Sequence, residues 1–466
     1  MKSKLGISTA ILGFIGVFFL ISLSIFFTND DFFLLKISQA SSISDFIGFF
    51  NPFYGPDGLG MYRPLTIQVY YFLARNIFAS APQILRIVSF LAISYAGYLV
   101  YQLAVKLSNS KSVGWYSVFF YLVSATHFAH LAYSATFQEI GLTIFVLLGV
   151  LSLWKNAYFS VLYFVFALLS KETAIVYPIL MSLVYVFYSR NTNPLSRTRL
   201  ILIPLAYAAI MSGYAYFRFF HYGFAAGDSY IWEISPKIIN TSAWYLLWSL
   251  NLPEMWVDFI GPGLKINPNL VRFWGRESFS ILLLFLIIAL SFIKTLAKSS
   301  LKSIIFTVVW FLASLGPLLL LPWHKFTFYL TLPMVGLAIF LAVQISKAPA
   351  NLKKIILISW FLLSWATLSL TIKTNWISNG AQTAYRLHSY LKTHPENFLG
   401  KSLVFYDQIS DDSLPWQPTQ VVKTALSDNN YFQVYWPGTS AVYLSQKPAK
   451  IDSSAVYLPA RQFIGY

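Results

Sequence analysis

Long apolar runs, broken by short polar segments, are the dominant pattern of this sequence. A helix needs about 20 apolar residues to cross the hydrocarbon core of a bilayer. About eleven runs approach or reach this length, so the pattern predicts an α-helical polytopic membrane protein of about 11 transmembrane helices. The predicted spans are Leu5–Phe27, Ile84–Leu107, Ser112–His130, Thr136–Trp154, Ala157–Ser170, Thr173–Ser189, Arg199–Phe220, Phe279–Leu296, Lys302–Leu321, Lys325–Ile345 and Leu352–Ile372.

The first run follows Lys2 and Lys4 and therefore has the charge pattern of a secretory signal peptide. However, the apolar stretch is longer than the core of a typical signal peptide, and Ser24–Asn29 lacks a small-residue cleavage pattern. We expect an uncleaved membrane anchor.

Composition supports the membrane assignment. Hydrophobic residues make up 57% of the chain, charged residues only 11%, and the mean hydropathy is +0.61. A soluble protein carries about a quarter charged residues, so this chain has too few charges to cover a water-facing surface. A soluble enzyme, a disordered scaffold and a fibrous repeat are excluded. Because the chain has no cysteine, a disulfide framework and a Cys-ligated metal site are excluded as well.

The net charge of +16 suggests a nucleic-acid partner only until the charges are located. With a cytoplasmic N-terminus and alternating spans, fourteen cations and no acidic residue fall on the cytoplasmic side. All 17 acidic residues fall on the far side. This is the positive-inside distribution, and it needs no nucleic acid. We expect a multi-pass protein of the plasma membrane with an extracytoplasmic C-terminus, or of the endoplasmic reticulum membrane in a eukaryote.

Three far-side segments are too long to be simple turns. Residues of about 28–83 and 220–278 would be loops of a membrane domain over residues 1–372. Residues 373–466 are more polar and predict a small C-terminal α/β extracytoplasmic domain. Its expected elements are a helix at Ser378–Thr393 and short β segments at Ser402–Tyr406, Tyr431–Tyr435, Ala441–Leu444 and Ala455–Leu458.

Asp30 and Asp31 follow the first span directly and form the first candidate for chemistry. Two adjacent carboxylates at the bilayer surface are costly to desolvate, and their repulsion would raise the pKa of one of them. A carboxylate with a raised pKa suits a general base toward a hydroxyl. The alternative is a solvated loop start that helps to set topology.

Cations occur at the same predicted depth. Arg63, in Tyr62-Arg63-Pro64-Leu65, could bind a phosphate bidentately or serve only as an interfacial anchor. Lys171 and Glu172 lie between two spans with almost no loop, so they indicate function unless they form a self-contained ion pair.

Other polar residues lie near the same face. Glu139 is about one turn inside the fourth span, and His324 lies in a tight turn between two spans, where it could contact an anion or merely cap the turn. His127 and His130 are interpreted as hydrogen-bonded interface residues. The sequence has no Gly-rich phosphate loop and no His-Glu-x-x-His pattern, so neither a nucleotide site nor a zinc site is indicated.

These residues together resemble the GT-C superfamily of polytopic glycosyltransferases, which use polyprenyl-phosphate-linked sugars. The likeness is greatest to the protein O-mannosyltransferase and aminoarabinose-transferase-like enzymes, including the TMTC type, and it extends to about Ile372. It rests on Asp30-Asp31, Tyr62-Arg63-Pro64-Leu65, Ser170-Lys171-Glu172 and the segment from His324 to Pro333. The chain departs from many members, which have Asp-Glu and a His-Pro-Pro-Leu type sequence at the first two places, and its tail shows neither an obvious β-trefoil nor tetratricopeptide repeats.

The resemblance implies an inverting transfer of a sugar from a polyprenyl-phosphate donor to an extracytoplasmic hydroxyl of a protein, lipid or glycan. Asp30 or Asp31 would be the catalytic base. The donor phosphate would be bound by Arg63, Lys171 and His324, and Glu172 would orient Lys171. Glu139, Glu172, Tyr62 and Tyr329 would bind or orient the sugar or the acceptor. No metal or other cofactor is required, because protein cations can neutralise a leaving phosphate monoester, although metal-using oligosaccharyltransferases belong to the same superfamily.

Two other functions are compatible with a polytopic chain. A lipid or sugar transporter would place polar residues near the bilayer midplane and break its spans in matched halves. An O-antigen ligase or polymerase would have a large Arg/His-rich loop late in the chain and no acidic pair after the first span. The sequence shows no matched halves, and its acidic residues lie at one face, which disfavours the transporter; the ligase or polymerase stays an alternative.

Overall fold

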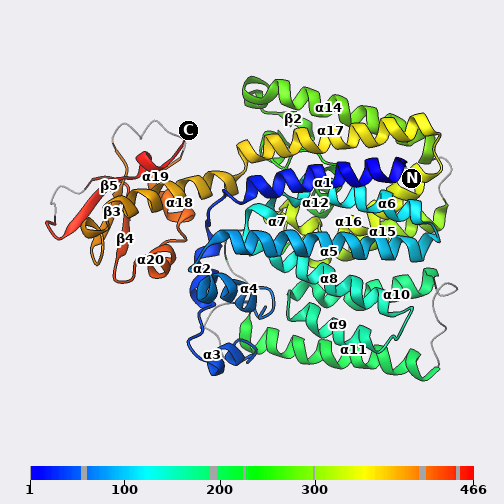
Figure 1. Cartoon of the computed structure of the whole chain (residues 1–466), viewed down its shortest axis with the longest axis horizontal. Helices are drawn as coiled ribbons and strands as arrows, with labels where there is room; N and C mark the ends of the chain where they lie inside the picture. Colours follow the sequence, from blue (N-terminus) through cyan, green and yellow to red (C-terminus); the bar gives the residue numbers. More distant parts are fainter. Residues whose placement is uncertain are drawn as a thin grey trace.

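The structure is a computed structural model that describes residues 2–53, 60–188, 197–223, 227, 229–296, 300–408, 416–447 and 452–465. Helices dominate it (Figure 1). They are α1 (Lys2–Ser22), α2 (Asp30–Ile37), α3 (Ile43–Gly48), α4 (Gln68–Phe72), α5 (Pro82–Ser108), α6 (Lys111–Leu122), α7 (Phe128–Ala132), α8 (Phe137–Ser152), α9 (Phe159–Leu168), α10 (Tyr177–Tyr188), α11 (Arg197–Phe217), α12 (Lys237–Ser249), α13 (Trp256–Phe259), α14 (Pro268–Leu296), α15 (Leu301–Leu315), α16 (Pro333–Ser346), α17 (Ala350–Thr374), α18 (Trp376–Thr393), α19 (Pro418–Ala425) and α20 (Asn430–Tyr435).

The chain is an α-helical membrane protein. Six of the described helices are long and apolar enough to cross a bilayer, and four shorter apolar helices accompany them. The six cover Pro82–Ser108, Ser134–Ser152, Thr198–Tyr222, Pro268–Ile293, Leu301–Leu320 and Ala350–Thr374. The total of about eleven spans stays a prediction.

The predicted span Ser112–His130 is wrong as a single helix, because α6 ends at Leu122 and the chain turns before α7. Side chains from other segments satisfy the backbone at this break. The carbonyl of Val123 accepts from Trp360 Nε1 over 2.7 Å and from Ser364 Oγ over 2.9 Å. The N–H of Ala125 donates to Asn251 Oδ1 over 2.8 Å. Irregular backbone is tolerated among apolar helices when protein groups bond it in this way.

The segment predicted as a loop over residues 220–278 contains more structure than expected. Helix α12 lies within it and buries Trp244, Tyr245 and Trp248. A two-stranded antiparallel hairpin, β1 (Ile260–Gly261) and β2 (Lys265–Ile266), follows. Helix α14 also begins at Pro268, well before the predicted start of its span.

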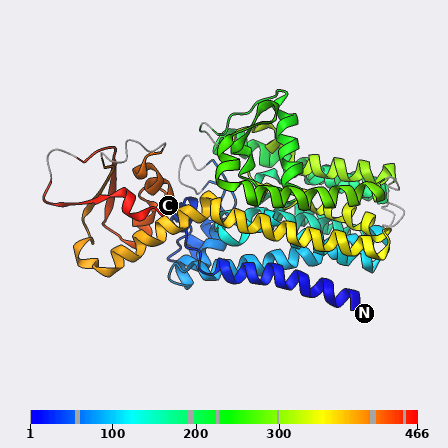
Figure 2. The same cartoon turned by 90° about the horizontal axis from the view of Figure 1, so that it is seen from above.

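The tail extends from one end of the helical bundle, and α17 leads almost directly into α18 (Figures 1 and 2). The predicted helix and three of the predicted strands are confirmed, whereas Tyr431–Tyr435 is helical and belongs to α20. The strands form a parallel sheet in the order β4-β3-β5, with β3 at Ser402–Tyr406, β4 at Ser440–Leu444 and β5 at Ala455–Pro459. The assignment of the tail as a separate extracytoplasmic domain stays a prediction.

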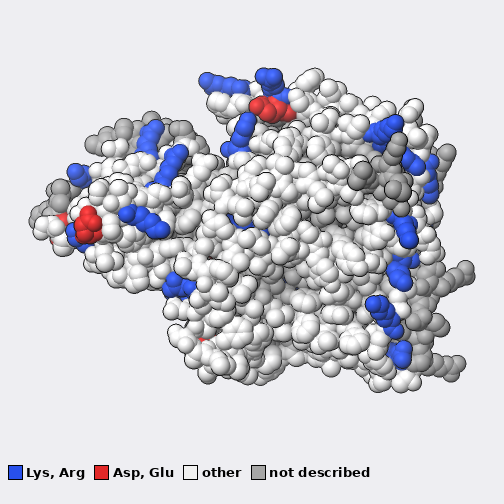
Figure 3. All heavy atoms as spheres, in the orientation of Figure 1, with Lys and Arg blue, Asp and Glu red and all other residues white. Residues whose placement is uncertain are grey.

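Charged side chains are unevenly distributed over the surface. On the face shown in Figure 3, Lys and Arg gather at the end of the bundle farthest from the tail, and no Asp or Glu is visible among the described residues there. This distribution agrees with the charge pattern of the sequence.

Candidate functional site

A cavity of about 960 Å³ lies where the bundle meets the tail, lined by residues from α2, from α11 and from Trp376, the first residue of α18. Segments far apart in the sequence therefore meet around it. Of the predicted site residues, the cavity is lined by Asp30, Arg63, Lys171, Glu172, His324 and Tyr329. Asp31, Glu139 and Tyr62 do not line it.

Asp30 is the first residue of α2 and is exposed to the cavity. Its Oδ2 accepts a hydrogen bond from the hydroxyl of Tyr133 over 2.9 Å. The surrounding protein raises the pKa of Asp30 above its ordinary value of 3.8 by desolvation, and the Tyr133 hydrogen bond and the charge of Arg63 offset part of this rise. A carboxylate with a raised pKa is a stronger base than a solvated one, and this one faces open space.

Asp31 is different from its neighbour, because its side chain is fully buried. Its Oδ1 accepts from the Tyr71 hydroxyl over 2.5 Å and from the Ala135 N–H over 3.0 Å, and its Oδ2 accepts from the Thr28 N–H over 3.4 Å. Burial raises its pKa to about 6, against the opposing charge of Arg86 and these hydrogen bonds. The expectation that either carboxylate can serve as the base is therefore corrected: only Asp30 reaches the cavity.

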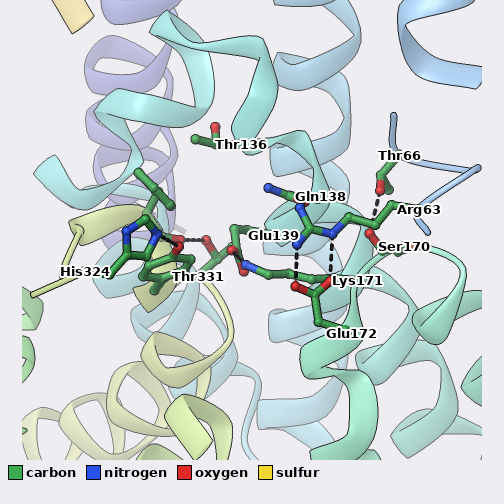
Figure 4. A network of polar contacts seen from close by, with 12 residues as sticks. Arg63, Thr66, Thr136, Gln138, Glu139, Ser170, Lys171, Glu172, His324 and Thr331 are labelled. Carbon is green, nitrogen blue, oxygen red and sulfur yellow. Dashed lines mark hydrogen bonds and ion pairs between the residues drawn. The ribbon is translucent and has the colours of Figure 1, made fainter. Parts of the chain in front are cut away.

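Arg63 and Glu172 form a bidentate ion pair across the cavity wall (Figure 4). Arg63 Nε donates to Glu172 Oε2 over 2.7 Å, and its Nη2 donates to Glu172 Oε1. Its Nη1 donates to Gln138 Oε1. A guanidinium has five N–H groups. Beyond these three bonds to described residues, two N–H groups remain for a ligand. Bidentate pairing fixes the plane of the guanidinium.

Lys171 pairs with Glu139, with both side chains at most 5% exposed. Its Nζ also lies 4.4 Å from the centroid of the Tyr329 ring, within cation–π distance. Among the described residues this ammonium makes one hydrogen bond, so two of its three N–H groups remain.

The expected pairing of Glu172 with Lys171 is wrong. Lys171 has extended backbone angles (φ −163°, ψ 142°), and neighbouring side chains on extended backbone point to opposite sides. Glu172 thus turns to Arg63 and Lys171 turns to Glu139. Glu139 is consequently a partner of Lys171 and not a group that faces the cavity.

His324 lies beside Tyr329, with its Nε2 2.8 Å from the tyrosine hydroxyl. Burial, followed by the charge of Lys171, lowers the pKa of His324 to about 4. The ring is therefore neutral near pH 7 and supplies no positive charge to a phosphate, in contrast to the expectation. It can contribute hydrogen bonds only.

The remaining predicted residues lie outside the cavity lining. The Tyr62 hydroxyl donates to the Phe50 carbonyl over 2.6 Å, and its ring stacks on Tyr222. His127 and His130 are buried, and each forms a hydrogen bond.

Sequence reasoning missed several residues of the cavity wall, among them Tyr133, Gln138, Arg218 and Trp376. Arg218 could have been found from the sequence, because a cation at the end of an apolar run indicates a candidate functional residue. Its guanidinium donates to the Gly60 carbonyl. Tyr133 and Gln138 could not have been found in this way, because neutral polar residues near the ends of spans are common.

Within the described ranges, no group of three or more His, Asp or Glu side chains gathers in a way that would hold a metal ion. No family model, no curated protein and no solved structure matches this chain.

Proposed function

We propose that the chain is an integral membrane glycosyltransferase that moves a sugar from a polyprenyl-phosphate donor to an acceptor hydroxyl. One observation carries the proposal: the carboxylate of Asp30 and the cations of Arg63 and Lys171 line one cavity, together with Glu172, Arg218 and a remaining wall that is largely apolar. A donor of this class needs a base, a phosphate contact and an apolar channel in the same place.

Asp30 would act as the general base. Its carboxylate takes the proton of the acceptor hydroxyl while the hydroxyl oxygen attacks the anomeric carbon of the donor sugar. The bond between that carbon and the phosphate oxygen breaks, and the electron pair leaves with the polyprenyl phosphate. Attack opposite the leaving group inverts the anomeric configuration.

The leaving phosphate would be stabilised by the N–H groups that Arg63 and Lys171 keep beyond their carboxylate partners. The two cations and their partners, Glu172 and Glu139, are neutral as a set of four. Such a set offers fixed N–H donors without a large excess of positive charge, which suits binding of the intact donor, a phosphate diester with one negative charge.

The lipid portion of the donor would lie against the apolar wall to which α11, the segment Arg218–Tyr222 and the turn after α15 contribute. Met211, Phe219, Leu318 and Leu321 line the cavity there. Residues 198–222 belong to one of the helices that can cross a membrane. A carrier chain could therefore reach the site from within the bilayer.

The distribution of charges supports one orientation in the membrane. The basic end of the bundle lies opposite the tail (Figures 1 and 3). If that basic end faces the cytoplasm, the tail and the cavity next to Trp376 face the outside of a plasma membrane or the lumen of the endoplasmic reticulum. The acceptor, whether protein, lipid or glycan, would then be extracytoplasmic.

The test is donor turnover by purified full-length protein in detergent. Polyprenyl monophosphates carrying hexoses, N-acetylhexosamines or aminopentoses are supplied, and release of polyprenyl phosphate is measured. The proposal is supported if the wild type turns over one of these donors and Asp30→Asn abolishes that turnover. Sugar or lipid flux in vesicles that survives Asp30→Asn, without turnover of any donor, would instead identify a transporter.

A further inference from the structure

The tail reaches Asp30 through the residues immediately before it. The Asn29 N–H donates to the carbonyl of Ala425, the last residue of α19, over 2.9 Å. The Thr28 hydroxyl donates to the same carbonyl over 3.2 Å. Thr28 is fully buried and Ala425 is 1% exposed, so these bonds form away from water, where leaving either partner unpaired is costly.

The backbone at this point needs support from outside. Asn29 has a φ of 49° and a ψ of −126°, in the left-handed half of conformational space, and its side chain does not cap α2. A non-glycine residue in such a region persists when surrounding contacts fix it. Since Asn29 is the residue before Asp30, its conformation sets the direction in which α2, and with it the Asp30 carboxylate, begins.

Helix α18 contacts the same residues from another side. A Cβ placed on Gly380 would lie 2.5 Å from Thr28 Oγ1 and 3.6 Å from Thr28 Cβ. Real Cβ atoms do not approach an oxygen so closely, so only glycine lets α18 pack directly against Thr28. Aromatic rings extend this contact, with Phe32 of α2 edge-on to Tyr431 of α20 at 5.2 Å between centroids.

The tail also contributes to the cavity itself. Trp376, the first residue of α18, lines the cavity and packs edge-on against Tyr133, with 5.2 Å between ring centroids. Tyr133 is the residue that donates to Asp30. The tail therefore contacts Asp30 along two independent routes, through the backbone of Asn29 and through the ring of Tyr133.

We propose that the C-terminal tail is a positioning element of the site. By bonding Asn29 and Thr28 through Ala425 and α18, it aims the Asp30 carboxylate into the cavity. Asn29 and Gly380 are positioning residues in this arrangement. The inference rests on the proposed function, because it gives the tail a role in the reaction that Asp30 would catalyse.

The first experiment tests the contact without any activity. The chain has no native cysteine, and the 3.6 Å between the Cβ positions of residues 28 and 380 is within the range of disulfides. Full-length protein carrying Thr28→Cys and Gly380→Cys should form an intramolecular disulfide under mild oxidation, detected as loss of maleimide labelling once the oxidised protein is denatured. The pair Thr28→Cys and Gly16→Cys, on α1, should stay labelled. Full labelling of the first pair would overturn the inference.

The second experiment tests the role. Gly380→Ala should lower kcat for donor turnover by about 10-fold or more with little change in KM, because a small misplacement of a catalytic group is sufficient for such a loss. Helix propensity alone favours alanine inside a helix, so a loss identifies the contact with Thr28 as the cause. Gly16→Ala, a helix glycine with nothing within 4 Å of the added Cβ, should stay within about 2-fold of the wild type.

A second-site change makes the test specific. Thr28→Ala removes the oxygen that the new methyl group meets and leaves the Asn29–Ala425 bond in place, so the double variant should recover at least half of the lost kcat. The positioning role would be overturned if Gly380→Ala had the same kcat as the wild type, or if the double variant recovered none of the lost kcat. If the disulfide forms but the wild-type protein turns over no donor, the proposed function fails. The contact between Thr28 and Gly380 is then still supported.

Discussion

The Tyr133 hydroxyl holds Asp30 at two points: it donates to Oδ2 over 2.9 Å and accepts from the Asp30 backbone N–H over 3.3 Å. Tyr133 is 3% exposed, so it cannot easily rotate away. A single buried side chain thus fixes both the carboxylate and the first peptide of α2. The carboxylate is thereby held in one orientation before a ligand arrives, which is how a base gains from preorganisation.

Tyr133→Phe should therefore lower kcat about 10–100-fold with a small change in KM, because the base loses its fixed orientation while the other cavity residues are unchanged. The Tyr133 hydrogen bond lowers the pKa of Asp30, so its removal should raise that pKa. Since the reaction needs the ionised carboxylate, the acid limb of the profile of kcat/KM against pH should move to higher pH. Tyr95→Phe, on the exposed side of α5, is the control, and an unmoved limb would contradict the assignment of Asp30 as the base.

The two neighbouring carboxylates should respond differently to the same change. Asp30→Asn should abolish donor turnover and leave thermal stability within a few degrees of the wild type, because Asp30 faces open space. Asp31→Asn should lower thermal stability near pH 5, because an amide NH₂ replaces one oxygen that accepts a buried hydrogen bond. Both variants are compared by donor turnover and by intrinsic fluorescence during thermal unfolding. Equal loss of turnover with unchanged stability in both would contradict the separate roles.

Asp31 also gives a dependence of stability on pH with a definite sign. Its pKa rises from an ordinary value of 3.8 to about 6 in the folded protein. The folded state therefore binds the proton more tightly than the unfolded state. The resulting stabilisation, about 3 kcal/mol, is fully present below about pH 4 and is lost as pH rises to 6. The measurement is the midpoint of thermal unfolding in detergent between pH 4 and 7, for wild type and Asp31→Asn. Asp31→Asn should lack this pH-dependent part of the stability. Identical slopes of the unfolding midpoint against pH in the two proteins would disprove the assignment to Asp31.

The features that follow from local chemistry could be predicted from the sequence. Bilayer thickness sets the length of apolar runs, and the bounds of β3 were predicted in full from its apolar residues and flanking turn signals. The position of Asp30 after the first span placed it at an end of the bundle. Which carboxylate faces the cavity could not be predicted, because consecutive residues on a helix point about 100° apart and the start of α2 fixes that direction.

The features that depend on tertiary packing could not be predicted. The sequence gives no partner for Arg63, yet Glu172 lies 109 positions away in the chain, and the extended backbone at Lys171 separates the two neighbours that looked like a pair. The stretch Tyr431–Tyr435 is helical because a short apolar run fits either a helix or a strand. In α20 its Tyr431, Phe432 and Val434 are all buried.

The pair of Lys171 and Glu139 gives a last prediction that separates folding from chemistry. Both side chains are almost fully buried, so Lys171→Met alone leaves the Glu139 carboxylate unpaired in the protein interior. Loss of one partner of a buried pair typically costs roughly 3–5 kcal/mol, and the yield and thermal stability of Lys171→Met should fall sharply. The double variant Lys171→Met, Glu139→Gln carries no buried charge and should recover most of that stability. It should not recover donor turnover, because the N–H groups proposed to contact the leaving phosphate are gone. The prediction is checked by thermal unfolding and by polyprenyl phosphate release. Both are measured on four proteins: the wild type, the two single variants Lys171→Met and Glu139→Gln, and the double variant. A double variant that is both stable and active would remove Lys171 from the site.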